Sequence, residues 1–299
     1  MKILVTGAAG QVGWELNRLL APLGEVIAID LADLDLTDEA ALRGFIQARA
    51  PDVIVNPAAY TAVDKAETQP DVAMAVNARA PAVMADEMAR RGGLMVHYST
   101  DYVFDGSKSG PWVETDTPNP LSVYGRTKLA GEEAVRAAGG AHYIFRTSWV
   151  YGRRGGNFML TMMRLAKERE ELRIVADQFG APTWCRMLAE RTRDVIRDTW
   201  VNTDVRPRVK RELSGVYHLT NGGRTTWHGF ASTIVATAPE LTDRRHVKVT
   251  PIATTDYPLP APRPANSILD NGKFERTFGT IAQPWDGALA ECLADRSVA

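Results

Sequence analysis

The stretch KILVTGAAGQVGWEL, residues 2–16, decides the fold of this chain. A short apolar run leads into Gly7, Gly10 and Gly13, which are spaced three residues apart and are followed by a helical pattern. Gly7 allows a sharp turn after the strand, Gly10 leaves room for a phosphate, and Gly13 lets the helix pack close to the sheet. The N-terminus of the helix then points at the anion. These glycines also suit a plain tight turn, but Asp30 at the end of the next apolar run favours dinucleotide binding.

Strand-like and helical segments alternate through the first half of the chain. The segments expected to be buried strands are 3–5, 25–29, 52–55, 94–98 and 143–145. Between them, residues 12–20, 39–49 and 72–91 carry apolar side chains at intervals of three and four, which is typical of helices. Strands that alternate with helices in this way form parallel βαβ units. The sequence therefore predicts an α/β fold, with a Rossmann-like doubly wound parallel sheet and helices on both of its faces.

The regular alternation weakens after about Gly152. One helix is expected near residues 158–169 and another ends near Val201, and the prolines at 258, 260, 262 and 264 require an extended loop. A chain of 299 residues is long for one core. We expect a nucleotide-binding domain over residues 1–150 and a smaller substrate-binding region over residues 151–299, with some of its segments returning to the sheet.

The composition indicates an ordinary globular protein. Apolar residues make up 45% of the chain, and 35 basic residues against 36 acidic ones give a formal charge of −1. This balance gives no sign of a nucleic acid or an anionic membrane as a partner. Without a run of eighteen apolar residues, no membrane span is expected. Cys185 and Cys292 show neither metal spacing nor a disulfide framework, and the chain starts with a strand rather than a signal peptide, so a cytoplasmic location is expected.

A second constellation lies at residues 98–132. Tyr124 and Lys128 are four residues apart, so a helix that begins near Pro120 places them on one face, one turn apart. A phenol has a pKa of about 10, and a nearby ammonium can lower it enough for the phenol to act as a general acid. Thr100 ends the fourth expected strand, at the edge where doubly wound sheets bind ligands. A surface helix that merely carries one tyrosine and one lysine is the alternative, and Thr100 makes catalysis the better interpretation.

Several stretches together resemble the extended short-chain dehydrogenase/reductases, and within them the dTDP-4-dehydrorhamnose reductase family. They are VTGAAGQVG, NPAAYTAVDKAE, STDYVFDG, NPLSVYGRTKLAGE, RTSWVYG, DQFGAPT and PRPANSILDNGKF. The resemblance covers essentially the whole chain. It implies an NAD(P)-binding domain joined to a smaller sugar-nucleotide domain. It also implies reduction of the 4-keto group of dTDP-4-dehydro-L-rhamnose to give dTDP-L-rhamnose.

The resemblance also implies roles for individual residues. Gly10, Gln11 and Val12 would line the pyrophosphate, and Asp30 would hold the adenosine ribose. Asp35 and Leu36 would flank the adenine, and Ala59, Tyr60 and Thr61 would form the cofactor loop. Thr100, Tyr124 and Lys128 match a catalytic triad, and Asp101 and Trp149 match substrate contacts. Asp35 is also a candidate helix cap, and Trp149 a candidate core residue.

Charged residues bear on the choice of cofactor and on metal binding. An acid such as Asp30 usually favours NADH and repels a 2′-phosphate, yet the family uses NADPH as well, so either NADPH or NADH is expected. Some relatives bind Mg²⁺ between subunits through carboxylates, and Glu15 matches one of them. Arg186 stands where a helical glutamate would be needed, so no metal is expected and the chain is a monomer or a homodimer.

Two other functions compete with the reductase. A dehydratase or epimerase of the same superfamily would place an acid pair after the threonine, but here Thr100 is followed by Asp101 and Tyr102. A non-catalytic NADP-binding subunit, similar to the regulatory subunit of methionine adenosyltransferase, would keep many of these motifs. Turnover of a keto sugar nucleotide separates that subunit from an enzyme.

Overall fold

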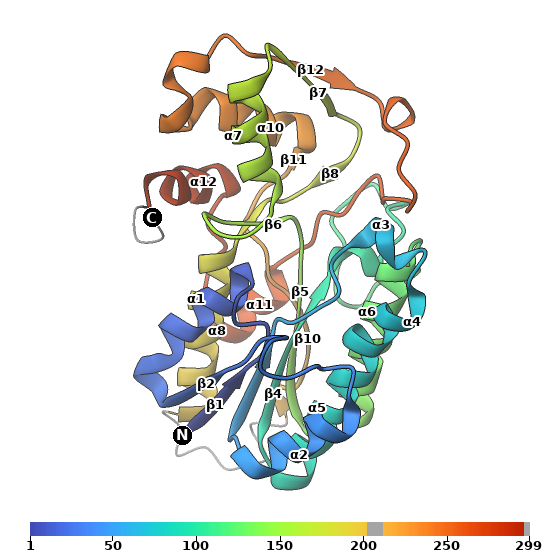
Figure 1. The fold of residues 1–299 in the computed structure, drawn as a ribbon, viewed down its shortest axis with the longest axis vertical. Helices are drawn as coiled ribbons and strands as arrows, with labels where there is room; N and C mark the ends of the chain where they lie inside the picture. Colours follow the sequence, from blue (N-terminus) through green and yellow to red (C-terminus); the bar gives the residue numbers. More distant parts are fainter. Residues whose placement is uncertain (202–211, 296–299) are drawn as a thin grey trace.

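The computed structural model describes residues 1–201 and 212–295, and a six-stranded parallel sheet lies at its centre (Figure 1). The strand order across the sheet is β2-β1-β3-β4-β5-β10. The bounds are β1 Lys2–Val5, β2 Glu25–Ala28, β3 Val53–Asn56, β4 Leu94–Thr100, β5 Ala141–Thr147 and β10 Gly215–His218. The chain runs outward from β1 to β2 and returns to β3 on the other side of β1. The topological switch point therefore lies between β1 and β3, where doubly wound sheets bind ligands.

Helices cover both faces of this sheet, which confirms the predicted fold class. On one face α1 (Gln11–Leu20) packs against α8 (Cys185–Ile196). On the other face α2 (Glu39–Arg49), α5 (Ala80–Arg91) and α6 (Val123–Ala137) lie side by side. Successive strand residues point to opposite faces, so Ile3 and Val5 join one hydrophobic core and Leu4 joins the other. This explains why the strands are apolar without alternation.

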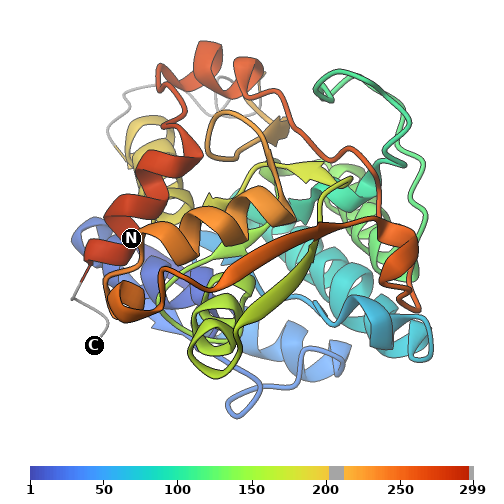
Figure 2. The same ribbon diagram turned by 90° about the horizontal axis from the view of Figure 1, so that it is seen from above.

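The second region stands above the carboxyl edge of the sheet in Figure 1. Its helices are α7 (Phe158–Glu168), α10 (Trp227–Thr237) and α12 (Trp285–Ala294), and β7 (Glu171–Val175) pairs in parallel with β12 (Lys248–Ile252). Shorter pairs are β6 (Val150–Tyr151) with β9 (Thr183–Trp184) and β8 (Phe179–Gly180) with β11 (Thr225–Thr226). Seen from above, α10 and α7 lie in front of the elements of the sheet layer (Figure 2).

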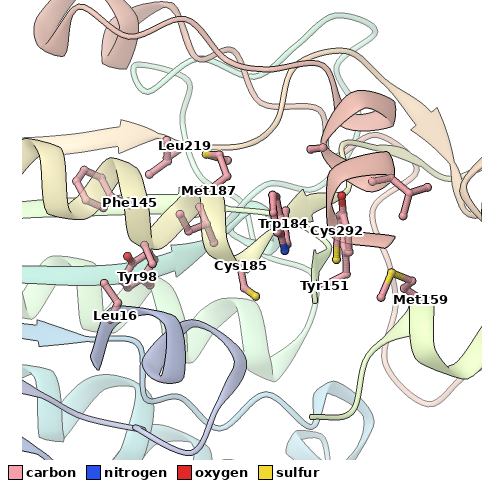
Figure 3. Packing of buried hydrophobic residues seen from close by; sticks show 14 of the residues in the cluster. Leu16, Tyr98, Phe145, Tyr151, Met159, Trp184, Cys185, Met187, Leu219 and Cys292 are labelled. Carbon is pink, nitrogen blue, oxygen red and sulfur yellow. The ribbon is translucent and has the colours of Figure 1, made fainter. Parts of the chain in front are cut away.

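One hydrophobic core connects the sheet to this second region. It contains Leu16 and Phe145 of the sheet layer together with Met159 of α7, Phe230 of α10 and Cys292 of α12. Figure 3 shows some of its side chains, from Leu16 and Phe145 past Cys185 and Trp184 to Cys292 and Met159. The strand β10 and the helix α8 come from beyond residue 150 but lie in the sheet layer. The division into residues 1–150 and 151–299 stays a prediction.

Two helices differ in detail from their sequence-based prediction. The helix expected over 72–91 is continuous but consists of α4 (Pro70–Met74), the π-helical turn η2 (Ala75–Arg79) and α5. The helix expected near Pro120 begins at Val123, because the hydroxyl of Ser122 caps it by accepting from Gly125 N at 3.1 Å. Among residues 1–201 and 212–295, no helix has the length and apolar character needed to cross a membrane.

The contact between α1 and the turn after β1 leads to a prediction. A Cβ on Gly13 would lie 2.0 Å from Gly7 O, so Gly13→Ala should lower the free energy of unfolding by about 1–3 kcal/mol. Gly44→Ala on α2 is the matched control, since nothing lies within 4 Å of its Cβ, and it should stabilise the protein by up to about 1 kcal/mol. Urea unfolding of both variants measures the difference. A Gly13→Ala variant as stable as the native chain would contradict the close contact.

Candidate active site

A cavity of about 550 Å³ opens at the switch point, along the carboxyl ends of β1, β2 and β3. Every residue expected to hold the cofactor lines it, and so do Tyr124 and Lys128 of the expected catalytic triad. These are Gly7, Gly10, Gln11, Val12, Asp30, Asp35, Leu36, Ala59, Tyr60, Thr61, Tyr124 and Lys128. Thr100 of the expected catalytic triad is not part of this lining, and neither are Asp101 and Trp149, which the resemblance assigns to the substrate. Residues far apart in the sequence therefore meet at one sheet edge, as the doubly wound topology requires.

The glycine turn has the geometry of an anion-binding loop. Gly7 has a φ of +59°, in the left-handed region that favours glycine. A Cβ on Gly7 would lie 3.0 Å from the Cα of Ala58, in the loop after β3. Gly10 N donates to Gly7 O at 3.0 Å, and α1 begins at the next residue. The first turn of α1 thus faces the cavity with backbone N–H groups that have no partner within the helix. A diphosphate fits this cradle.

The acid after β2 has two contacts within the turn region. Asp30 accepts hydrogen bonds from Ala9 N and Leu31 N, both at 2.7 Å. The carboxylate therefore also fixes the glycine loop. Asp35 accepts from the backbone N and the hydroxyl of Thr37, which lowers its pKa. The cap of α2 is Asp38, which accepts from Ala41 N, so the cap that was an alternative role for Asp35 belongs to Asp38.

An asparagine that sequence reasoning missed holds the cofactor loop. Asn77 is fully buried in the π-helical turn η2, and its side chain bonds both the N and the O of Tyr60. Its amide also donates to Thr127 Oγ1 on α6 at 3.0 Å. The loop after β3 is thereby joined to the helix that carries Tyr124 and Lys128. A polar residue on the otherwise apolar face of the 72–91 helix was the available signal, and π-helical turns are frequent at functional sites.

A second missed contact comes from the loop before α7. Gly155 and Gly156 line the cavity beside the glycine turn. Asn157 donates from its amide to Gln11 Oε1 and to Gly152 O, both at 2.9 Å, and its own Oδ1 caps α7. This loop therefore lies against the start of α1. Nothing in the local sequence pattern connects residues 146 positions apart.

The three residues expected in catalysis lie on β4 and α6. Thr100 is the last residue of β4, as predicted, and its hydroxyl donates to Asp101 Oδ1 at 2.9 Å. Lys128 is 2% exposed, and its Nζ donates to Tyr98 O at 2.6 Å. Tyr124, one turn earlier on α6, has its ring edge-on to Tyr102 with centroids 5.9 Å apart.

Burial decides the electrostatics of these side chains. It raises the pKa of Tyr124 to about 12, and a hydrogen bond with Thr100 acts in the opposite direction. Burial lowers the pKa of Lys128 to about 8, although the negative charge of Glu132 raises that pKa in part. Lys128 is not among the groups that shift Tyr124, so the structure differs from the expectation that this ammonium lowers the pKa of the phenol. The desolvation of the phenolate outweighs the expected charge effect.

The two expected substrate residues lie on the side of the second region. Asp101 is 2% exposed, and its Oδ1 accepts a hydrogen bond from Thr100 Oγ1 at 2.9 Å. Trp149 has a φ of +48°, which is uncommon for a residue other than glycine, and its ring stacks on Trp227 with centroids 3.6 Å apart. Gly180 faces this ring, and a Cβ there would lie 2.5 Å from it. The structure therefore gives Trp149 a packing partner as well as a fixed position.

The carboxylate considered for metal binding is held by cations. Glu15 is buried and pairs with Arg186 at 3.1 Å and with Arg18 at 2.8 Å. Arg186 also contacts Asp295 at 2.6 Å, so its guanidinium lies between two carboxylates. Both carboxylates are therefore neutralised by a guanidinium, and the absence of a metal at Glu15 stays a prediction.

Comparison with known proteins shows the family to which the chain belongs. The profile of the RmlD substrate binding domain family matches residues 1–298. A dTDP-4-dehydrorhamnose reductase of Burkholderia thailandensis is 50% identical and covers 99% of each chain. The structure of a dTDP-4-dehydrorhamnose reductase from Clostridium acetobutylicum superposes with a TM-score of 0.89 at 41% identity, covering 98% of this chain and 99% of that one. The Bacillus anthracis reductase, solved in complex with NADP, gives 0.86 at 34% identity and covers 99% of both chains. The chain therefore belongs to the RmlD family of dTDP-4-dehydrorhamnose reductases.

Proposed function

We propose that this protein reduces the 4-keto group of dTDP-4-dehydro-L-rhamnose to give dTDP-L-rhamnose, with NADPH or NADH as the reductant and Tyr124 as the proton donor. One observation carries the proposal. The cavity that begins at the glycine turn ends at Tyr124 and Lys128, so a cofactor held at one end reaches a proton donor at the other. Membership of the reductase family over residues 1–298 supplies the substrate class.

The residues of the cavity fit a nicotinamide dinucleotide. The N–H groups at the start of α1 would bind the diphosphate, and Asp30 would accept from the hydroxyls of the adenosine ribose. The loop at Ala59–Thr61, fixed by Asn77, would close over the middle of the cofactor. Lys128 would donate to the nicotinamide ribose. A bound NADPH or NADH supplies the hydride that reduces C4 of the sugar.

Tyr124 would protonate the carbonyl oxygen as it becomes a hydroxyl group. With a pKa of about 12, the phenol stays protonated at neutral pH, which a proton donor needs. An alkoxide is more basic than a phenoxide, so the proton still moves downhill. Thr100, hydrogen-bonded to Tyr124, would hold the same oxygen and would donate to the phenolate that forms.

Asp101 and Trp149 would contact the sugar nucleotide. Asp101 follows Thr100 in the chain and is hydrogen-bonded to it, and the ring of Trp149 stacks on Trp227 of the second region. Binding of the remote nucleotide would orient the keto group, so the proposal requires a nucleotide-linked substrate. Free 4-keto sugars should react far more slowly.

The test of this function is cofactor oxidation with dTDP-4-dehydro-L-rhamnose, for the native chain and for Tyr124→Phe. The variant keeps the ring and loses only the hydroxyl, so the cofactor affinity should stay near the native value while kcat falls by roughly 10²–10⁴. Tyr143→Phe is the matched control, because it removes a buried hydroxyl that lies outside the cavity lining, and its kcat should be unchanged.

Two outcomes of this experiment would contradict the proposal. If Tyr124→Phe keeps native kcat, Tyr124 is not the proton donor. If the native chain binds cofactor but turns over no keto sugar nucleotide, the non-catalytic subunit is the better interpretation. Equal rates with and without the nucleotide would remove the proposed substrate class.

Asp30 leads to a prediction about the choice of cofactor. Asp30→Ala should raise the Kd for NADH more than the Kd for NADPH, because the carboxylate bonds a ribose hydroxyl but repels a phosphate. Asp33→Ala is the control, since Asp33 bonds the backbone N of Asp30 without lining the cavity, and it should weaken both cofactors alike. Fluorescence titration measures both constants. Equal losses in Asp30→Ala would mean that Asp30 only anchors the glycine loop through Ala9.

Asp101 leads to a prediction about pH and stability. Burial raises its pKa to about 7, so the folded chain keeps a proton there that the unfolded chain releases at about pH 4. The folded state thus binds more protons, and its free energy of unfolding should fall by about 3 kcal/mol between pH 5 and 8 through this group. Asp101→Asn should lack this contribution. Urea unfolding at both pH values tests it, and an equally steep fall in the variant would contradict the prediction.

A further inference from the structure

A buried ion pair lies directly beneath the proposed catalytic residues. Arg146 on β5 donates to Glu132 on α6 from Nε at 2.9 Å and from Nη2 at 2.7 Å. Their side chains are only 4% and 2% exposed, the lowest values for an ion pair in the described part of the chain. The Arg146 guanidinium also lies over the ring of Phe104, 5.0 Å from its centroid. Neither residue lines the cofactor cavity or has a role in the mechanism above.

Glu132 joins α6 to the end of β4. Its carboxylate accepts from Ser99 Oγ at 2.5 Å, and one turn earlier Lys128 donates to Tyr98 O. The next strand residue, Thr100, is hydrogen-bonded to Tyr124, which lies one further turn back along α6. Three successive residues of β4 thus contact side chains that are spaced four apart on the helix. The contact of Glu132 is the deepest of the series and is fixed from β5 by Arg146.

The backbone shows how closely the helix is seated here. Gly131 precedes Glu132, and a Cβ on it would lie 2.1 Å from Asn77 O, so α6 lies against η2 without an intervening side chain. A slip of the helix along β4 would separate Glu132 from both Ser99 and Arg146. Taking two charges out of water has a large desolvation cost, which apolar side chains of similar size would avoid. Stability alone therefore gives no reason for an ion pair at this position.

Charge gives a second reason for the pair. Glu132 is the group whose negative charge raises the pKa of Lys128 against the effect of burial. Of the other ionisable groups near Lys128, His97 and Tyr98 on β4 are both kept neutral by burial. Arg146 on β5 is paired with Glu132, and Asp101 on η3 (Asp101–Val103) acts on Tyr124.

We propose that Glu132, held by Arg146 and Ser99, is a positioning residue that fixes the register of α6 on β4 and supplies the negative charge facing the Lys128 ammonium. The inference rests on the proposed function, because it concerns the placement of Tyr124 and Lys128. It assigns to the Glu132–Arg146 pair a role in the reaction, in addition to its place in the core.

The experiment uses the double variant Glu132→Leu/Arg146→Met in the full chain. Removing both charges leaves neither member of the Glu132–Arg146 pair buried without its partner, so the double variant should fold and keep a melting temperature near the native one. Its kcat with the keto sugar nucleotide should fall by about 10²-fold, because small displacements of catalytic groups have effects of this size. The KM for the sugar nucleotide should change less than about threefold, since no substrate contact is altered.

The pH profile of kcat separates this role from a purely structural one. Lys128 loses its charge as the pH rises through its pKa of about 8, and without Glu132 that pKa falls further. The falling alkaline limb should therefore move to lower pH in the double variant. The single variant Glu132→Gln should shift the limb in the same direction, although it leaves Arg146 unpaired and should be less stable.

A remote ion pair provides the matched control. Arg43 on α2 bonds the buried Glu87 on α5, and neither lines the cavity. The variant Arg43→Met/Glu87→Leu should leave kcat and its pH profile unchanged. A folded Glu132→Leu/Arg146→Met variant with kcat within threefold of the native value, or with an unmoved alkaline limb, would overturn the inference. Absence of turnover in the native chain would instead refute the proposed function.

Discussion

The close approach of Gly13 to Gly7 is the constraint on which the cofactor half of this structure depends. Because neither residue has a side chain, α1 begins directly over the turn after β1, and its first N–H groups reach the cavity. The same turn receives Asp30 from β2 through Ala9 and touches Ala58 after β3. Three strand ends are thus fixed around one short loop. The loop sets the position of the cavity. The cavity extends from this loop to Tyr124 and Lys128 on α6.

The sequence was sufficient to predict the parts whose physics is local. Buried parallel strands are apolar throughout, so the first five strands were recognisable, and glycines at positions 7, 10 and 13 have few other uses after a strand. Tyr124 and Lys128 were predicted because a helix brings residues four apart onto one face. Thr100 followed from the rule that ligands bind at the carboxyl ends of strands. Each of these arguments needs only a few neighbouring residues.

Other features depend on contacts that span the chain and could not be predicted. Asn77 is buried in the π-helical turn, and its side chain bonds Tyr60 and Thr127, which are far from it in the sequence. The contact of Asn157 with Gln11 joins the second region to the first turn of α1. The pKa of Tyr124 was expected to fall because the sequence places Lys128 near it. In the structure the pKa rises instead, because the phenol is buried. Burial is a property of the assembled molecule.

The core that connects the two regions has a consequence for how this molecule unfolds. Separate domains within one chain usually meet at modest, polar interfaces and open independently. Here Leu16 and Phe145 belong to the same buried cluster as Phe230 and Cys292, and β10 returns to the sheet from beyond α8. Cooperativity should therefore extend over both regions, with a single transition. A destabilising substitution in the core side chains of α10 or α12 should therefore lower the fraction of molecules in which the turn at Gly7 is formed, although the turn itself is unchanged.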